Sequence, residues 1–287
     1  MQRVLGLLLF ALLLTLLARE FVHRRSTFYE AGTLRPPYAV LHPAYYGKLA
    51  LWIDPLGCAD APGCTTRIGR TAAALNHETA RLLAYEAGLW HYFRYIGTSH
   101  PPDSCLPDSL RSQRARRAQP DLVIVLDLIP QARRGWPFLR RLAGYLGLGP
   151  LRRGYRITYL TEGPGSRRSR YLARAIDSTL QLAGFVGYPG GHLRGRSARD
   201  EPRLAPYRDF PSATLLLEIA PCDADYEKVL RAKWIRRWMM QTVLAGVTVY
   251  LSRAHAWGVE PVVSWPEAAA AATSGKAPAS ATRVPPP

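Results

Sequence analysis

The chain has 287 residues, of which 48% are hydrophobic, and a formal net charge of +17. This apolar content predicts a real hydrophobic core, and the length suits one domain of roughly 200 residues with tails. The charge favours anionic partners such as lipid headgroups, wall polymers or nucleic acid. Arginine pairs scattered beside Ala, Gly and Pro also arise from compositional bias, and no nucleic-acid-binding module accompanies them, so we expect no nucleic-acid partner.

The N-terminus predicts membrane targeting. Arg3 precedes an apolar run from Val4 to Leu17, and charged residues resume at Arg19. A run of about 15 apolar residues matches a signal-peptide core and is slightly short for a spanning helix, which needs about 20. Because no small-x-small cleavage site follows, we interpret the segment as an uncleaved anchor, with a cleaved signal as the alternative. The predicted organisation is an anchor at 1–22, a linker at 23–36, a folded domain at 37–260 and a disordered tail at 261–287.

Within the folded part, compact aliphatic runs predict strands, and apolar residues near helical spacing predict helices. The predicted strands are 48–54, 121–129, 155–159 and 213–219. The predicted helices are 71–95, 169–184, 223–230 and 234–251. Strands that alternate with helices indicate an α/β domain with a mostly parallel central sheet and helices on both faces. In such sheets functional residues gather at the carboxyl ends of strands.

Four cysteines, Cys58, Cys64, Cys105 and Cys222, are too few for a disulfide scaffold in a domain of this size. Cys58 and Cys64 bracket a Pro-Gly turn and could close a small loop if the domain lies in an oxidising compartment. The alternative is four unrelated thiols. The chain has no CxxC pair, which argues against a cysteine-based zinc site.

Carboxylates interrupt or end three of the predicted strands. Glu218 lies late in a run of Ala, Leu and Ile, where a charge is costly unless it is paired, bound to metal or facing a cleft. We favour a functional role over a structural ion pair with one of the many arginines. For Asp127 a functional role and a loop-capping role stay equally open. Asp54, in the sequence Ile-Asp-Pro, repeats the pattern less strongly.

Motifs around these carboxylates resemble those of one enzyme family. Along the chain they are Asp54-Pro55, Ser169–Ile176, Pro211–Glu218, Asp225–Leu230 and the stretch from Gln241 to Tyr250. In this order they resemble the zinc-dependent N-acetylmuramoyl-L-alanine amidases, periplasmic enzymes that cut the lactyl-amide bond between peptidoglycan glycan and stem peptide. The resemblance implies an amidase-like α/β domain, a peptidoglycan ligand and a periplasmic location.

The resemblance also implies a zinc ion held by His, Glu and His, with a second Glu as general base. Glu218 matches that base. The positions of the three ligands fall on Leu56 or Gly57, on Ala72 or Glu78, and on Asp127. A substitute site from Asp127, Glu78 and His77 is the alternative, since carboxylates bind zinc or harder metals. His77 and Glu78 point about 100° apart on a helix and share one ion poorly. We therefore expect that the family's ordinary zinc site is lost, and that zinc is present only if the protein is active.

Three further residues, Asp54, His192 and Arg194, are predicted to form the rim of a cleft. His192 lies in a Gly-rich loop, and Arg194-Gly195 resembles an Arg-Gly step of the family. The alternative for His192 is a solvated loop residue. The stretch 133–153 mixes aromatic residues with arginine, which suits a membrane surface or a covered groove, or else an ordinary surface helix.

Three functions follow from the sequence. The favoured one is a membrane-anchored envelope protein with a degenerate amidase-like domain that binds peptidoglycan or a wall-enzyme partner. The others are an active, divergent metal-dependent amidase with Glu218 as base, and a basic membrane-tethered binding protein. The family resemblance places the domain in the periplasm, whereas Arg19, Arg24 and Arg25 put more positive charge after the apolar run than Arg3 puts before it, which favours the opposite orientation.

Overall fold

A computed structural model describes residues 45–66, 68–130, 154–188, 191–222 and 228–261. Its described strands form one sheet in the order β2-β1-β3-β6-β4-β5. The strands are β1 (Leu49–Pro55), β2 (Phe93–Thr98), β3 (Leu122–Ile129), β4 (Arg156–Leu160), β5 (Leu193–Arg196) and β6 (Ala213–Pro221). The helices are α2 (Ala72–Gly88), α3 (Asp108–Ala118), α5 (Ser166–Leu182), α6 (Lys228–Arg231) and α7 (Lys233–Trp257), with a 3-10 helix η2 (Pro202–Tyr207).

Strand direction confirms the predicted mostly parallel sheet. β2, β1, β3 and β6 pair in parallel. β4 runs antiparallel to β6, and β5 runs parallel to β4. The β3–β6 register places Asp127 beside Glu218, and the β4–β6 register places Arg156 on the other side of Glu218. The central strands therefore bring two predicted carboxylates and one arginine side by side.

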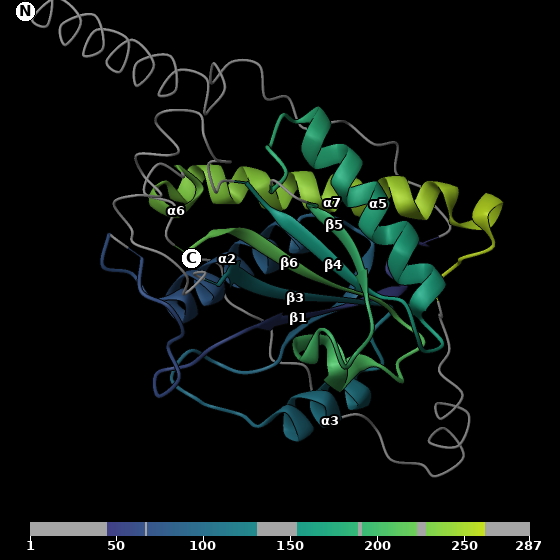
Figure 1. The fold of residues 1–287 in the computed structure, drawn as a ribbon. Coiled ribbons are helices and arrows are strands. Elements are labelled where there is room, and N and C mark those ends of the chain that lie inside the picture. Colours follow the sequence, from purple (N-terminus) through teal and green to yellow (C-terminus); the bar gives the residue numbers. More distant parts are fainter. Residues whose placement is uncertain (1–44, 67, 131–153, 189–190, 223–227, 262–287) are drawn as a thin grey trace, which may run out of the picture.

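Helices cover both faces of the sheet, as predicted. Figure 1 shows α5 and α7 on one side and α3 on the other. Leu122, Ile124 and Leu126 pack in the larger core, whereas Val123 and Val125 pack in the smaller core that η2 helps to form. This alternation follows from the two-residue period of a strand. Asp127 and Glu218 continue the smaller-core series, so both lie on the face that η2 covers.

The larger core depends on a close approach of two helices. A Cβ atom on Gly246 of α7 would lie 2.6 Å from the Ile176 Cα of α5. Glycine is therefore required at this contact because any other side chain would force the helices apart. In the resulting α5–α7 layer, α5 packs on β4 and β6, and the buried residues of both helices belong to the larger core.

The predicted helix 71–95 is wrong at its C-terminal end. Thr71 does cap the helix by accepting a hydrogen bond from the Ala74 N–H at 3.2 Å. The helix ends at Gly88, and Phe93 begins the edge strand β2. Apolar residues continue across this turn at spacings that fit either element, so the sequence pattern did not separate them. The predictions also missed α3, whose buried residues are only Arg111 and Ala115, and the short strand β5.

No helix in the described ranges is long and apolar enough to cross a membrane. Three predicted segments lie outside those ranges: the anchor 1–22, the linker 23–36, and the stretch 133–153 that mixes aromatic residues with arginine. So do residues 262–287 of the predicted tail and the first residues of the predicted helix 223–230.

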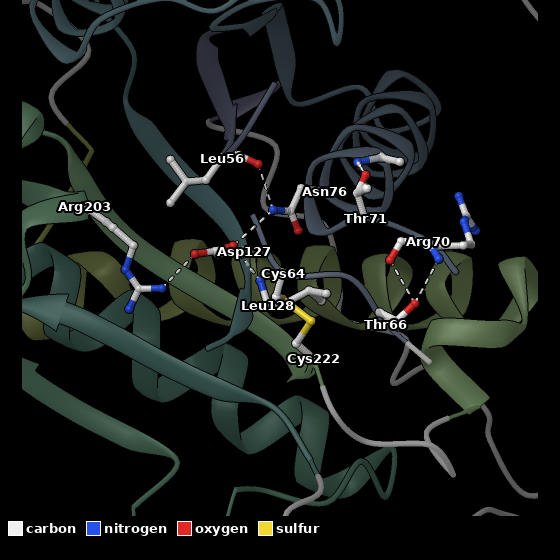
Figure 2. The surroundings of a disulfide bond; sticks show 11 residues. Leu56, Cys64, Thr66, Arg70, Thr71, Asn76, Asp127, Leu128, Arg203 and Cys222 are labelled. Carbon is white, nitrogen blue, oxygen red and sulfur yellow. Dashed lines mark hydrogen bonds and ion pairs between the residues drawn. A yellow bond between two sulfur atoms is a disulfide. The ribbon is translucent and has the colours of Figure 1, made fainter. Parts of the chain in front are cut away.

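The cysteine prediction is corrected by two disulfides. Cys58 pairs with Cys105 and Cys64 pairs with Cys222, with Cα–Cα distances of 5.3 and 6.4 Å. Cys58 and Cys64 do not pair with each other because each faces a different neighbouring segment of the fold. Both bonds hold the loop between β1 and α2, and Cys64–Cys222 ties it to the end of β6 (Figure 2).

Candidate functional site

Two carboxylates lie side by side near the carboxyl ends of the central strands. Asp127 belongs to β3 and Glu218 to β6, and the two are register partners. The Glu218 side chain is fully buried, and that of Asp127 is 17% exposed. Two negative charges this close, with so little water, need cations beside them.

Arg203 of η2 supplies one of these cations. Its Nη1 donates to Asp127 Oδ2 at 2.8 Å and to Glu218 Oε1 at 3.0 Å. Its Nε and Nη2 donate to the two oxygens of Glu201 at 2.6 and 3.0 Å. Burial alone would lower the pKa of Arg203, but the hydrogen bonds to Glu201 and the charges of Glu218 and Asp127 raise it. The guanidinium is therefore a fixed internal cation that bridges the two strands.

Arg156 of β4 supplies the second cation. Its Nε donates to Glu218 Oε2, and its Nη2 donates to Glu218 Oε1 at 2.6 Å. The Arg156 guanidinium also lies 5.6 Å from the ring centroid of Tyr188. Both oxygens of Glu218 thus accept hydrogen bonds from arginine, in the paired geometry that guanidinium and carboxylate favour.

Asn76 of α2 completes the cluster, and the sequence prediction missed it. Its Nδ2 donates to Leu56 O at 2.8 Å and to Asp127 Oδ1 at 3.1 Å, as Figure 2 shows. Its Oδ1 is buried and has no hydrogen-bond partner. An amide on a helix gives no signal in the sequence, because a polar uncharged residue at one position of an amphipathic helix is ordinary. We call Asn76, Asp127, Arg156, Arg203 and Glu218 the strand-end cluster.

The predicted metal residues His77 and Glu78 point away from Asp127. Glu78 pairs with Arg70 and, at 2.8 Å, with Arg236. His77 Nε2 lies 3.1 Å from Gly57 O. Successive helix residues are about 100° apart, so Asn76, and neither Ala72 nor Glu78, is the α2 residue that reaches Asp127.

The residues at this place do not fit a zinc ion. Zinc sites need side-chain donors such as imidazole, thiolate or carboxylate. Leu56 offers only its backbone carbonyl, Asn76 directs its amide N–H at Asp127, and the Arg203 cation occupies the side between the carboxylates. Across the described part of the chain, no three His, Cys, Asp or Glu side chains are grouped to hold a metal ion.

Two of the three predicted rim residues, Asp54 and His192, contact side chains of neighbouring elements. Asp54 is fully buried and accepts hydrogen bonds from Arg111 Nη1 at 2.5 Å and Tyr207 Oη at 2.6 Å. Burial and the charge of Asp54 raise the pKa of Tyr207 well above its ordinary value. The ring of His192 lies 2.9 Å from the Gln181 amide of α5, so it faces the helix rather than Glu218.

Arg194 does lie near the cluster. It is on β5, where its register partner is Thr158 of β4, and its Nε donates to Gly191 O at 2.7 Å. Burial and the positive charges of Arg156 and Arg196 lower its pKa. The two-residue period of a strand puts all three arginines on one face of the paired strands β4 and β5. The site therefore joins a neutralised carboxylate pair to three neighbouring arginines, Arg156, Arg194 and Arg196, which we call the arginine-rich flank.

No protein-family model and no curated protein matches the chain. Its fold matches solved amidase structures. The N-acetylmuramyl-L-alanine amidase Ami1 of Mycobacterium abscessus is 18% identical, with a TM-score of 0.55 over 71% of this chain and 98% of that one. An N-acetylmuramoyl-L-alanine amidase of Clostridium difficile is 16% identical, with a TM-score of 0.55 over 72% and 98%. AmiC2 of Nostoc punctiforme is 14% identical, with a TM-score of 0.53 over 72% and 99%. The chain therefore has the fold of the N-acetylmuramoyl-L-alanine amidases.

Proposed function

We propose that this chain is a membrane-anchored cell-envelope protein whose amidase-like domain binds peptidoglycan without cutting it. The observation that carries the proposal is the Arg203 guanidinium, which bridges Asp127 and Glu218. In the enzymes that the chain resembles, a metal ion activates the attacking water. Here the positive charge beside the carboxylates comes from a side chain, which cannot offer an open coordination position to water.

The surroundings of Glu218 also argue against a role as general base. A base must reach the proton that it removes. The Glu218 side chain is fully buried, and its oxygens are held by Arg156 and Arg203. These contacts give it a structural partner on each side. They favour a binding domain over an active, divergent amidase, although Glu218 keeps the family's position.

The arginine-rich flank supplies the chemistry for binding. This flank lies on the face of the sheet that carries Glu218. Its members are Arg156, Arg194 and Arg196, which alternate along β4 and β5 with residues that pack on the larger core, namely Ile157, Tyr159 and Leu193. Peptidoglycan stem peptides carry carboxylates. Charge-assisted hydrogen bonds from guanidinium to carboxylate are the strong class of such contacts.

The disulfides support a location outside the reducing cytoplasm. Structural disulfides persist mainly in oxidising compartments such as the periplasm. Two of them, Cys58–Cys105 and Cys64–Cys222, brace the loop beside the strand-end cluster. We therefore place the domain on the periplasmic side of the membrane, tethered by residues 1–22, despite the positive charges that follow the apolar run.

The test uses the purified full chain and peptidoglycan sacculi. We expect co-sedimentation with sacculi, no release of stem peptides by mass spectrometry, and no stoichiometric zinc. Arg194→Glu combined with Arg196→Glu should weaken binding at least tenfold. Arg253→Glu, at the far end of α7, changes charge away from the flank and should leave binding within about twofold.

Each alternative function has its own outcome. Stem-peptide release that Glu218→Gln abolishes would show an active amidase. If binding is equally weakened per charge at Arg194, Arg196 and Arg253, and vanishes at high salt, only the overall positive charge matters. That result would favour a basic tethered binding protein with no specific site.

A further inference from the structure

A second surface of the domain lies on the outer sides of α2 and α7, away from the strand-end cluster. Trp234 is 53% exposed and Tyr85 is 39% exposed, although both are large and apolar. The Trp234 and Trp238 ring centroids are 6.4 Å apart. We define the aromatic-basic face as Arg81, Tyr85, Lys233, Trp234, Arg237 and Trp238. The exposed rings of Tyr85 and Trp234 belong to neither the proposed peptidoglycan site nor the core, whereas Trp238 is half buried against the larger core.

The cations of this face are interleaved with its aromatic rings. The Arg237 guanidinium lies 5.4 Å from the ring centroid of Tyr85. Arg81 and Lys233 are exposed. Aromatic rings with polar edges and neighbouring cations are the side chains that favour the interfacial region of a bilayer.

Acidic side chains near the face are already engaged. Glu86 is 2% exposed and binds Arg237 and, at 2.9 Å, the Gln241 amide. Glu78 binds Arg70 and Arg236. The cations that remain at the surface therefore give the face a positive charge, which complements anionic lipid headgroups.

We infer that the aromatic-basic face docks on an anionic lipid surface, with Trp234 inserted among the headgroups. α2 and α7 pack against one another, so their outer sides form a continuous surface. α7 has 25 residues, which corresponds to a helix about 38 Å long. The face would thus hold the domain against the membrane and fix which side the arginine-rich flank presents to the wall.

The tether permits this contact. The predicted anchor ends at residue 22, and the described domain begins at Tyr45. The 22 intervening residues, 23–44, span at most about 75–80 Å when extended, which exceeds the length of α7. The docking inference uses the proposed anchor only as a source of local concentration. It does not depend on peptidoglycan binding.

The test measures tryptophan quenching in vesicles that contain no peptidoglycan. The full chain is reconstituted into vesicles of phosphatidylcholine with or without phosphatidylglycerol, each with a lipid brominated near the headgroup. We expect quenching to increase when phosphatidylglycerol is present. Trp234→Phe should remove most of that increase. Trp257→Phe, which changes a half-buried indole stacked on Tyr171 at the other end of α7, should keep it.

A charge variant separates docking from tethering. Arg81→Glu with Lys233→Glu should lower the equilibrium constant for docking on anionic lipid at least tenfold. Each cation near the surface contributes about fivefold to that constant. Far-ultraviolet circular dichroism checks that each variant is folded. Equal quenching in the native protein and Trp234→Phe, or no dependence on phosphatidylglycerol, would overturn the inference and leave a protein partner as the occupant. Loss of sacculus binding would instead bear on the proposed function alone.

Discussion

Replacement of Arg203 by methionine tests whether an internal cation holds the strand-end cluster together. The change removes the hydrogen bonds that Arg203 donates to Asp127 and Glu218, keeps those from Asn76 and Arg156, and leaves both carboxylates in place. Register partners on adjacent strands have side chains about 5 Å apart. At that distance two like charges repel by about 3 kcal/mol at an effective dielectric of about 20. Breaking a buried ion pair costs about 3–5 kcal/mol, and the Arg203 side chain is 23% exposed, so we expect about 3 kcal/mol.

Urea unfolding of the full chain at pH 7 and pH 5 measures this loss. Two neighbouring carboxylates repel one another only while both are charged, and a lower pH favours the neutral form of a carboxyl group. The deficit relative to the native protein should therefore shrink as the pH falls. Arg208→Met is the matched control. Arg208 is 57% exposed, and its partner Glu162, 3.6 Å away, is 37% exposed, so this ion pair lies near the surface. Its loss should change the free energy of unfolding by less than about 0.5 kcal/mol.

Asp127→Asn in the Arg203→Met background should restore much of the stability, since it removes one of the two repelling charges. A loss below about 0.5 kcal/mol for Arg203→Met would refute the reasoning, because the bridge would then contribute no more than an exposed ion pair. A loss that is equal at pH 5 and pH 7 would also refute it. Such a result would point to lost packing rather than uncompensated charge.

Three further changes test other parts of the structure. Replacing Cys64 and Cys222 by serine should cost about 3–5 kcal/mol, because the bond closes a loop of sequence separation 158, and thermal unfolding with and without dithiothreitol measures it. Burial raises the pKa of Asp121 to about 6. Between about pH 4 and pH 6 the folded state therefore holds a proton that the unfolded state releases, so the free energy of unfolding should fall as the pH rises through this range. Asp121→Asn should remove that dependence in urea unfolding at several pH values. Tyr207→Phe should cost about 1–3 kcal/mol in the same assay, because Asp54 is buried and Tyr207 is one of its two side-chain donors.

Much of the fold was predictable because it depends on local patterns. Aliphatic runs predicted β1, β3 and β6, and helical spacing predicted α5 and α7. Edge elements were missed because their residues are only half buried, so their hydrophobic pattern is incomplete. The boundary between α2 and β2 was lost for a related reason, since apolar residues continue through the turn that separates them.

The sequence by itself determined the α/β architecture, the strand-end positions of Asp127 and Glu218, and the high positive charge. Strand periodicity and the cost of burying a charge are local properties, so they can be inferred from residue order. Only the tertiary structure decided the partners. Arg203, Asn76 and the cysteine pairs come from segments far apart in the chain, and a helix rotation of about 100° per residue decides whether Asn76 or Glu78 faces Asp127. The site is therefore a property of how the segments pack, which residue order alone does not specify.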